Sequence, residues 1–153
     1  MLKIRKATIE DCDKLVTLLL QLFEQETEFI PNRSLHVKGL ESILRDGSVG
    51  VILVAENEKS IIAMVSLLWS ISTALGTRVA WLEDMVVDNA FRSKGIGSVL
   101  IHEAIAYAQS VGCRRITLLT DGDNIPAHRF YEKCGFQASS MQPFRLLLSD
   151  VSC

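Results

Sequence analysis

The pattern of hydrophobic and polar positions in the N-terminal third of the chain predicts one strand followed by two helices. Apolar and charged residues alternate over residues 2–7, which is typical of a strand with one buried face. The next segment carries leucines at helical spacing, and Thr8 followed by Asp11 at its start resembles a capping box. A second helix is expected over residues 34–44, with Ser34 as its N-cap.

The middle of the chain changes to a pattern of strands. Residues 49–56 and 61–72 are rich in β-branched side chains, and the polar turn between them favours an antiparallel hairpin. A loop is expected over residues 73–78, and a third strand is expected over residues 79–87.

The last third alternates between helix and strand. Apolar residues at spacing i, i+3, i+4, i+7 predict a helix that ends at Gly112. A strand is expected over residues 116–120 and a helix over residues 126–135. Two short strands are expected at the end, over residues 136–138 and 144–148. This order indicates an α/β or α+β fold, with a mixed, mostly antiparallel sheet flanked by about four helices.

Length and charge narrow the class of protein. The chain has 153 residues, so residues 1–153 are expected to form a single domain. The net charge of −2 argues against nucleic-acid binding, which usually needs a basic face. The longest apolar stretch, residues 61–69, is too short for a bilayer, which takes about 20 residues, so no membrane partner is expected.

Neither the cysteines nor the histidines have the spacing of a metal site or a C-x-x-C motif, so no metal is expected. Scattered thiols and the lack of a signal-peptide pattern favour a reducing compartment, and a soluble, cytoplasmic protein is expected. The residues concerned are Cys12, Cys113, Cys134, Cys153, His36, His102 and His128.

The segment Val86–Leu100 has the features of a phosphate-binding site. It predicts a strand, then a loop with the cations Arg92 and Lys94, and then a helix. A helix N-terminus presents free N–H groups, and Gly95 and Gly97 let a phosphate approach the backbone closely. The chain has no Walker A run, and a leucine fills the third small position of the dinucleotide fingerprint, so both nucleotide motifs are disfavoured.

Two motifs carry a resemblance to the GNAT superfamily of N-acetyltransferases. The R-x-x-G-x-G run that starts at Arg92 is similar to the R/Q-x-x-G-x-G/A loop of that family. The run that starts at Asn124 is similar to its N-x-x-A-x-x-F-Y-x-x-x-G-F signature. The predicted order of elements matches the family as well, so the resemblance covers essentially the whole chain and implies the GNAT fold.

The resemblance implies a binding site for coenzyme A. Backbone amides of Arg92–Ser98 would hold the pyrophosphate, the strand Met85–Val87 would pair with the pantetheine arm, and Asn124 would contact that arm. The implied coenzyme-binding residues are Met85, Val86, Val87, Arg92, Ser93, Lys94, Gly95, Ile96, Gly97, Ser98, Asn124, Ala127, Phe130 and Tyr131.

The resemblance also implies two catalytic residues. Tyr131 stands where the family often places a general acid, and a phenol can protonate a departing thiolate. Glu83 stands where many members place a carboxylate base. Glu83 and Asp84 face opposite sides of a regular strand unless a bulge intervenes, so Asp84 and a water relay are alternative routes for the proton.

The implied activity is an acetyl-CoA-dependent N-acetyltransferase that moves an acetyl group directly to an amine of a small molecule or a protein. The alternative is a catalytically inactive coenzyme A-binding sensor or partner module. The implied partners are acetyl-CoA and the amine acceptor, and a homodimer stays open. Residues 23–30 are expected to frame the acceptor pocket, where three glutamates could attract a cationic amine.

Overall fold

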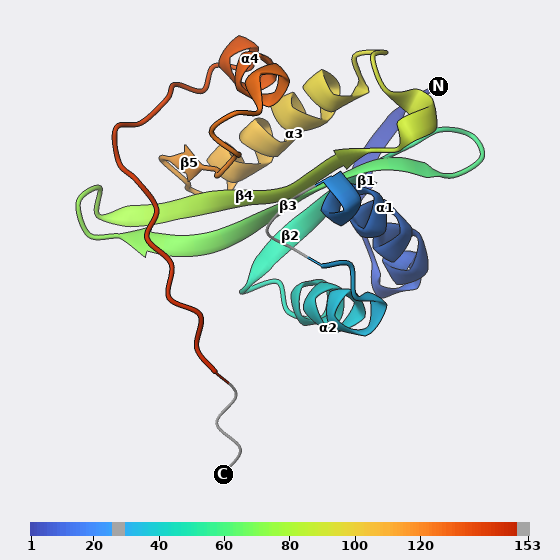
Figure 1. The fold of residues 1–153 in the computed structure, drawn as a ribbon, viewed down its shortest axis with the longest axis horizontal. Helices are drawn as coiled ribbons and strands as arrows, with labels where there is room; N and C mark the ends of the chain where they lie inside the picture. The colour runs from blue at the N-terminus through green and yellow to red at the C-terminus, as the bar shows by residue number, and fades with distance from the viewer. Residues whose placement is uncertain (26–29, 150–153) are drawn as a thin grey trace.

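The computed structural model describes residues 1–25 and 30–149. Within them a mixed five-stranded sheet has the order β1-β2-β3-β4-β5, in which β1 to β4 are antiparallel neighbours and β5 runs parallel to β4. Figure 1 shows α1 and α2 on one face of this sheet and α3 and α4 on the other. The elements are β1 (Lys3–Lys6), η1 (Ile9–Asp11), α1 (Cys12–Gln25), α2 (Arg33–Leu44), β2 (Gly50–Glu56), β3 (Ile61–Ser72), β4 (Thr77–Val87), η2 (Asn89–Phe91), α3 (Ile96–Ser110), β5 (Ile116–Thr117) and α4 (Ile125–Lys133).

The predicted fold class is confirmed, because helices flank both faces of a mostly antiparallel mixed sheet. Strand alternation divides the core between these faces. On the side of α1, Leu18, Ile52 and Val54 belong to one buried cluster, the α1-face cluster. On the side of α3, Leu53 and Leu100 belong to a second one, the α3-face cluster. None of the helices in the described part of the chain has the length and apolar character needed to cross a membrane.

The caps of the first two helices follow local hydrogen bonding. The Asp11 carboxylate accepts from the Thr8 backbone N–H at 2.7 Å, as the capping pattern predicts. The predicted N-cap at Ser34 is wrong. Asn32 caps α2 instead, because its side-chain oxygen accepts from the Leu35 N–H at 3.2 Å, and Ser34 lies inside the first turn.

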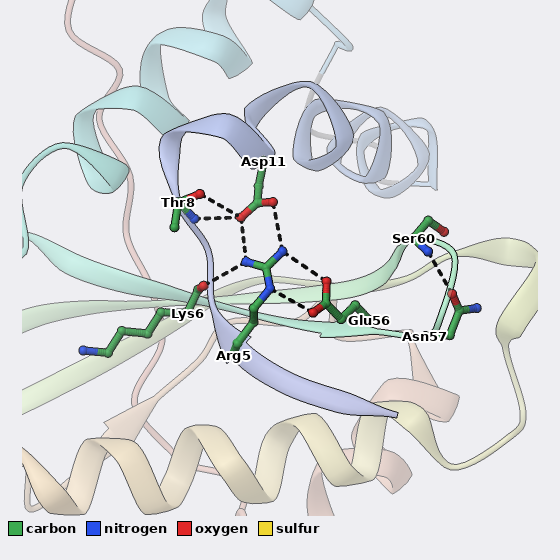
Figure 2. A network of polar contacts seen from close by, with 7 residues as sticks. All are labelled: Arg5, Lys6, Thr8, Asp11, Glu56, Asn57 and Ser60. Atoms are coloured by element: carbon green, nitrogen blue, oxygen red, sulfur yellow. Dashed lines mark hydrogen bonds and ion pairs between the residues drawn. The ribbon is translucent and has the colours of Figure 1, made fainter. Parts of the chain in front are cut away.

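A network of charged side chains ties the edge strand β1 to its neighbours (Figure 2). The Arg5 guanidinium donates to both Asp11 carboxylate oxygens, at 2.8 and 3.0 Å, and to Glu56 at 3.1 Å. These hydrogen bonds from Arg5 hold the pKa of Asp11 below its usual value of 3.8. The network therefore joins β1 to η1 and to β2.

The C-terminal end of the fold departs from the sequence-based prediction. The strand expected over residues 116–120 is only two residues long, Ile116–Thr117, because β4 and β5 separate after that point. The two strands expected over residues 136–138 and 144–148 are wrong for the single chain, since residues 136–149 form no strand. A strand needs a neighbour that accepts its hydrogen bonds, and this segment runs away from the sheet instead (Figure 1).

Candidate active site

A β-bulge divides strand β4 into two parts. Glu83 pairs with Ser66, whereas the next ladder pair joins Val86 to Met64, so β4 carries one residue more than β3 over this interval. Asp84 has a positive φ of 53°, a conformation that a non-glycine residue adopts only under local constraint. The β-bulge that the sequence analysis named as a possibility is therefore present in β4.

The bulge shifts the alternation of side chains along β4. Leu82 and Met85 both pack with the α3-face cluster, although they are three residues apart, and Val86 packs with the α1-face cluster. Glu83, which follows Leu82, accordingly lies on the α1 face of the sheet. Glu83 is exposed to solvent and Asp84 is half-buried.

Strands β4 and β5 pair over a short distance and then open. Their ladder comprises only Ala80 with Ile116 and Trp81 with Thr117, and β4 continues to Val87 beyond it. The Asp88 N–H donates to the Ile62 carbonyl of β3 at 2.8 Å. Because backbone groups alternate in direction, those of Met85 and Val87 turn toward the opposite, opened edge.

The loop after β4 leads directly into the N-terminus of α3. Its backbone takes left-handed conformations at Ser93, with φ 64°, and at Gly95, with φ 79°. The N–H groups of the first helical residues, Ile96–Ser98, have no acceptor within the helix, and the intrahelical ladder starts with Val99 donating to the Gly95 carbonyl at 3.2 Å. Such a run of amides at a helix N-terminus is suited to an anion.

Two glutamines of α1 brace this loop, and the sequence-based reasoning missed both. The Asn89 N–H donates to the Gln21 side-chain oxygen at 3.0 Å. With its amide oxygen turned to the guanidinium, Gln25 accepts from Arg92 Nη1 at 3.1 Å, and Arg92 Nε donates to the Val87 carbonyl at 3.2 Å. The sequence offers only one sign of this role, which is that Gln21 and Gln25 lie four residues apart on the polar side of α1. Such a pair is hard to distinguish from a solvated helix face.

Gly97 is the point where three predicted segments meet. A Cβ built on Gly97 would lie 3.2 Å from Phe130 Cζ and 3.3 Å from Met85 Cε. The missing side chain thus allows the start of α3 to approach both β4 and α4 closely. The loop that precedes α3, the strand β4 and the helix α4 therefore come together at Gly97.

The signature residues of α4 hold the helix in position. The Asn124 side-chain oxygen accepts from the Ala127 N–H at 3.3 Å and caps the helix. The half-buried Tyr131 ring lies against two aromatic rings, with centroid distances of 5.1 Å to Phe130 and 5.7 Å to Phe136. Tyr131 and Glu83 therefore come from the two faces of the sheet, on either side of the opening between β4 and β5.

Ser66 adds a polar group that the sequence-based reasoning also missed. It is fully buried, it is the ladder partner of Glu83, and its hydroxyl has no hydrogen-bond partner among the described residues. Burial of an unpaired hydroxyl costs roughly 1–3 kcal/mol. In the sequence it reads as one more small residue inside a strand.

The histidines and cysteines named in the sequence analysis make contacts typical of structural residues. His128 contacts the Asp121 carbonyl at 2.8 Å, and His102 contacts the Ser98 carbonyl at 2.7 Å. Cys113 and Cys134 are buried free thiols, and burial raises the pKa of Cys113. No group of three metal-binding side chains occurs in residues 1–25 and 30–149. Part of the predicted acceptor segment, residues 26–29, and Cys153 lie outside the described residues.

The fold and the opened strand beside a helix N-terminus are those of an N-acetyltransferase. The model of the acetyltransferase (GNAT) family matches residues 15–136, and the chain belongs to this family. Members of the family use acetyl-CoA as co-substrate.

Individual relatives support the assignment. The chain is 30% identical over 139 residues to the uncharacterized N-acetyltransferase YhfO of Bacillus subtilis, an alignment that covers 89% of this chain and 90% of that one. A local alignment with the glucosamine 6-phosphate N-acetyltransferase of Trypanosoma brucei brucei is 37% identical over 67 residues and covers 44% of each chain. The crystal structure of the glucosamine-6-phosphate N-acetyltransferase of Arabidopsis thaliana superposes with a TM-score of 0.75 and 30% identity, over 95% of this chain and 98% of that one.

Proposed function

We propose that residues 1–153 act as one domain that binds acetyl-CoA and transfers its acetyl group directly to an amine. The observation that carries this proposal is the opened edge of β4, which ends at the free amides of the α3 N-terminus. A ligand with an extended amide arm and a pyrophosphate at one end matches both features at once.

The residues present fit coenzyme A. The amides of Ile96, Gly97 and Ser98, together with the left-handed turns before them, would hold the pyrophosphate. The backbone groups of Met85 and Val87 would bond the amide arm in the manner of an additional strand. The Lys94 ammonium, which is exposed and lies 5.5 Å from the Phe91 ring centroid, adds positive charge beside the loop.

Two side chains would manage the protons of the reaction. When bound, the thioester supplies an activated acetyl group. The amine must be neutral to attack it, and Glu83 on the α1 face would accept the proton that the amine loses. Tyr131 on the other side of the opening would donate a proton to the departing thiolate sulfur.

Ser66 supports the placement of the base. Its buried hydroxyl lies in the strand beside Glu83 and lacks a protein partner among the described residues. A water molecule between these groups would satisfy the hydroxyl and relay the proton from amine to carboxylate. This arrangement favours Glu83 over Asp84, whose backbone turns out of register at the bulge.

We further propose that the acceptor is a primary amine of a small molecule and that the protein works in the cytoplasm. Three relatives whose names state an acceptor support a small molecule: those from Trypanosoma and Arabidopsis act on glucosamine 6-phosphate, and one from Salmonella typhimurium acts on an aminoalkylphosphonate. The buried free thiols of Cys113 and Cys134 are compatible with a reducing compartment.

The test is release of free coenzyme A thiol from acetyl-CoA across a panel of amines. The panel contains glucosamine 6-phosphate, a polyamine, a lysine peptide and a peptide with a free N-terminus. Acceptor-dependent release, with the acetylated amine seen by mass spectrometry, supports the enzyme. Tight coenzyme A binding without release for any amine would favour the alternative, a sensor or partner module.

A further inference from the structure

The two tryptophans of the chain differ in how far their rings are covered. Trp69, on β3, packs against the α3-face cluster, and its indole N–H donates to the Gly47 carbonyl at 3.2 Å. Trp81, on β4, is 39% exposed to solvent. Strand β4 has a neighbour on each side, and a tryptophan at such a position is usually covered by the layer packed on the sheet. The exposed indole of Trp81 is therefore a candidate contact surface.

Trp81 lies on the same face of the sheet as Glu83. Its neighbours Ala80 and Leu82 belong to the α3-face cluster, so strand alternation directs the indole to the α1 face. The ladder between β3 and β4 is regular here, with Trp81 opposite Leu68. Two residues of a strand span about 7 Å, so the indole and the carboxylate are neighbouring side chains on one surface.

The buried cluster beneath α1 and α2 stops short of Trp81. Its members on β3 and β4 are Ile61, Met64 and Val86, which all lie on the other side of the bulge. Toward their hairpin, β3 and β4 extend beyond α1 and α2 (Figure 1). The residues of β3 and β4 that surround Trp81 on this face form the Trp81 surface, which consists of Ser66, Leu68, Ser70, Val79, Trp81 and Glu83.

We propose that Trp81 determines acceptor specificity, and that the acceptor is a primary amine whose body is apolar and contains a flat ring. The ring stacks on the exposed indole, and a short alkyl arm carries the amine to Glu83. The carboxylate and the indole both attract the ammonium form of the amine before it loses its proton. This inference rests on the proposed function, because it takes Glu83 as the position of the acceptor amine.

The charge of the Trp81 surface disfavours an acceptor that carries a phosphate beside its ring. Glu83 is the one charged residue among the six described residues of this surface, so an anion there would be repelled and would find no counter-charge among them. Two cations close by in the sequence have other positions: Arg78 lies over the Trp69 ring at 5.4 Å, and Arg115 lines a groove beside the end of α3. The expected acceptor thus differs from glucosamine 6-phosphate.

Binding is tested by fluorescence of the Trp69→Phe variant, whose single tryptophan is Trp81. With coenzyme A present, phenethylamine should change the Trp81 emission to a saturating value, whereas ethylamine and glucosamine 6-phosphate should change it little. The Trp81→Phe variant, which keeps only Trp69, is the matched control and should show no response. Equal responses to phenethylamine and ethylamine, or a response only in the control, would overturn the role of Trp81.

Kinetics separate a specificity role from a structural one. Trp81→Ala should raise the KM for phenethylamine at least about tenfold, with kcat and coenzyme A affinity close to the parent. Trp81→Phe restores a flat ring and should recover most of this loss, and Ser70→Ala, on the same surface, should change neither constant. The KM for ethylamine, which has no ring to stack, should stay the same in Trp81→Ala.

The outcomes distinguish this inference from the proposed function. Acetylation of phenethylamine with a KM that Trp81→Ala leaves unchanged would overturn the inference and leave the acetyltransferase standing. Preferred acetylation of glucosamine 6-phosphate would do the same. No acetyl transfer to any amine would overturn the proposed function. Shielding of Trp81 from acrylamide quenching only at concentrations where the chain is dimeric would assign the Trp81 surface to a second copy and overturn the inference.

Discussion

Two polar clusters at the sheet, one around Arg5 and one around Ser66 and Glu83, differ in how their hydrogen-bonding groups are satisfied. In the network on β1, Arg5 is matched by the carboxylates of Asp11 and Glu56 at 2.8 to 3.1 Å. At the opening of β4, by contrast, the buried Ser66 hydroxyl lacks a partner among the described residues, and Glu83 beside it faces solvent.

This difference suggests that the Arg5 cluster stabilises the fold, whereas the opening of β4 serves the proposed activity. A network whose donors and acceptors match one another contributes to stability and leaves nothing for a ligand. An opened strand with a left-handed Asp84 and unpaired backbone groups costs stability, and such costs persist where a ligand completes the site. Substitutions in the first cluster should therefore change stability, and those in the second should change activity.

The largest effect is expected from Tyr131→Phe. The variant keeps the ring and its contacts with Phe130 and Phe136 but loses the proton donor. The turnover number should fall by roughly 10²–10⁴-fold, with coenzyme A affinity and melting temperature close to the parent. Tyr107→Phe, on α3, is the matched control and should keep full turnover. Turnover of Tyr131→Phe within about twofold of the parent, with chemistry rate-limiting, would make Tyr131 structural.

A smaller and pH-dependent effect is expected from Glu83→Gln. A protonated amine cannot attack, so a base matters most below the amine pKa, which for a primary amine is about 10. The loss in kcat/KM should therefore be largest near neutral pH and shrink as the pH rises. Asp84→Asn is the control, because its position at the bulge turns it out of register. The opposite pattern in the two pH–rate profiles would assign the base to Asp84.

In the cluster around Arg5, the substitution Arg5→Ala should lower the free energy of unfolding by about 1–3 kcal/mol without changing turnover. Its side chain is mostly shielded, and its loss leaves two carboxylates without their partner. Denaturant unfolding and the acetyl-transfer assay measure the two quantities. A loss of turnover at unchanged stability would remove the distinction between the clusters.

The pH dependence of the free energy of unfolding at acidic pH also tests the role of the Arg5 cluster. Asp11 has a folded pKa below 3.8, so its contribution is fully present above the unfolded pKa and disappears as the pH falls through the folded pKa. Parent stability should consequently drop on acidification below about pH 4. In Arg5→Ala this part of the pH dependence should be reduced, because Arg5 is the main cause of the lowered pKa.

The smallest effects are expected at two glycines and have opposite signs. A Cβ added at Gly95 or at Gly39 would have no atom within 4 Å, so the backbone conformation alone determines how an alanine there changes stability. Gly95→Ala forces alanine into φ 79° and should cost about 1–2 kcal/mol. Gly39→Ala, inside α2, should stabilise by about 0.5–1 kcal/mol. Thermal melts of both variants compare the strained loop with a regular helix.

Regular elements were predictable from the sequence because their signals are local. Strand β3 has the predicted bounds, Ile61–Ser72, because a long β-branched run between polar turns has one stable solution in a buried sheet. The cap of α2 was misplaced by two residues, since Asn32 and Ser34 are both good caps and only tertiary placement selects between them.

Features that depend on partners were not predictable. The bulge at Asp84 follows from how β4 pairs with β3, and the roles of Gln21 and Gln25 follow from the docking of α1 against the loop. The segment 144–148 has strand composition, but a strand forms only where an edge is offered. The motifs, in contrast, located the loop and α4 correctly, because helix starts need particular residues at fixed spacing.

Amide hydrogen exchange with and without coenzyme A tests the central claim most directly. Added coenzyme A should slow exchange at Met85 and Val87, on the opened edge of β4, and at Ile96–Ser98. The amides of β1 and β2 around the Arg5 network should exchange as before. Protection confined to other parts of the chain, or none at saturating coenzyme A, would contradict the assignment of the opened strand and the α3 N-terminus as the coenzyme site.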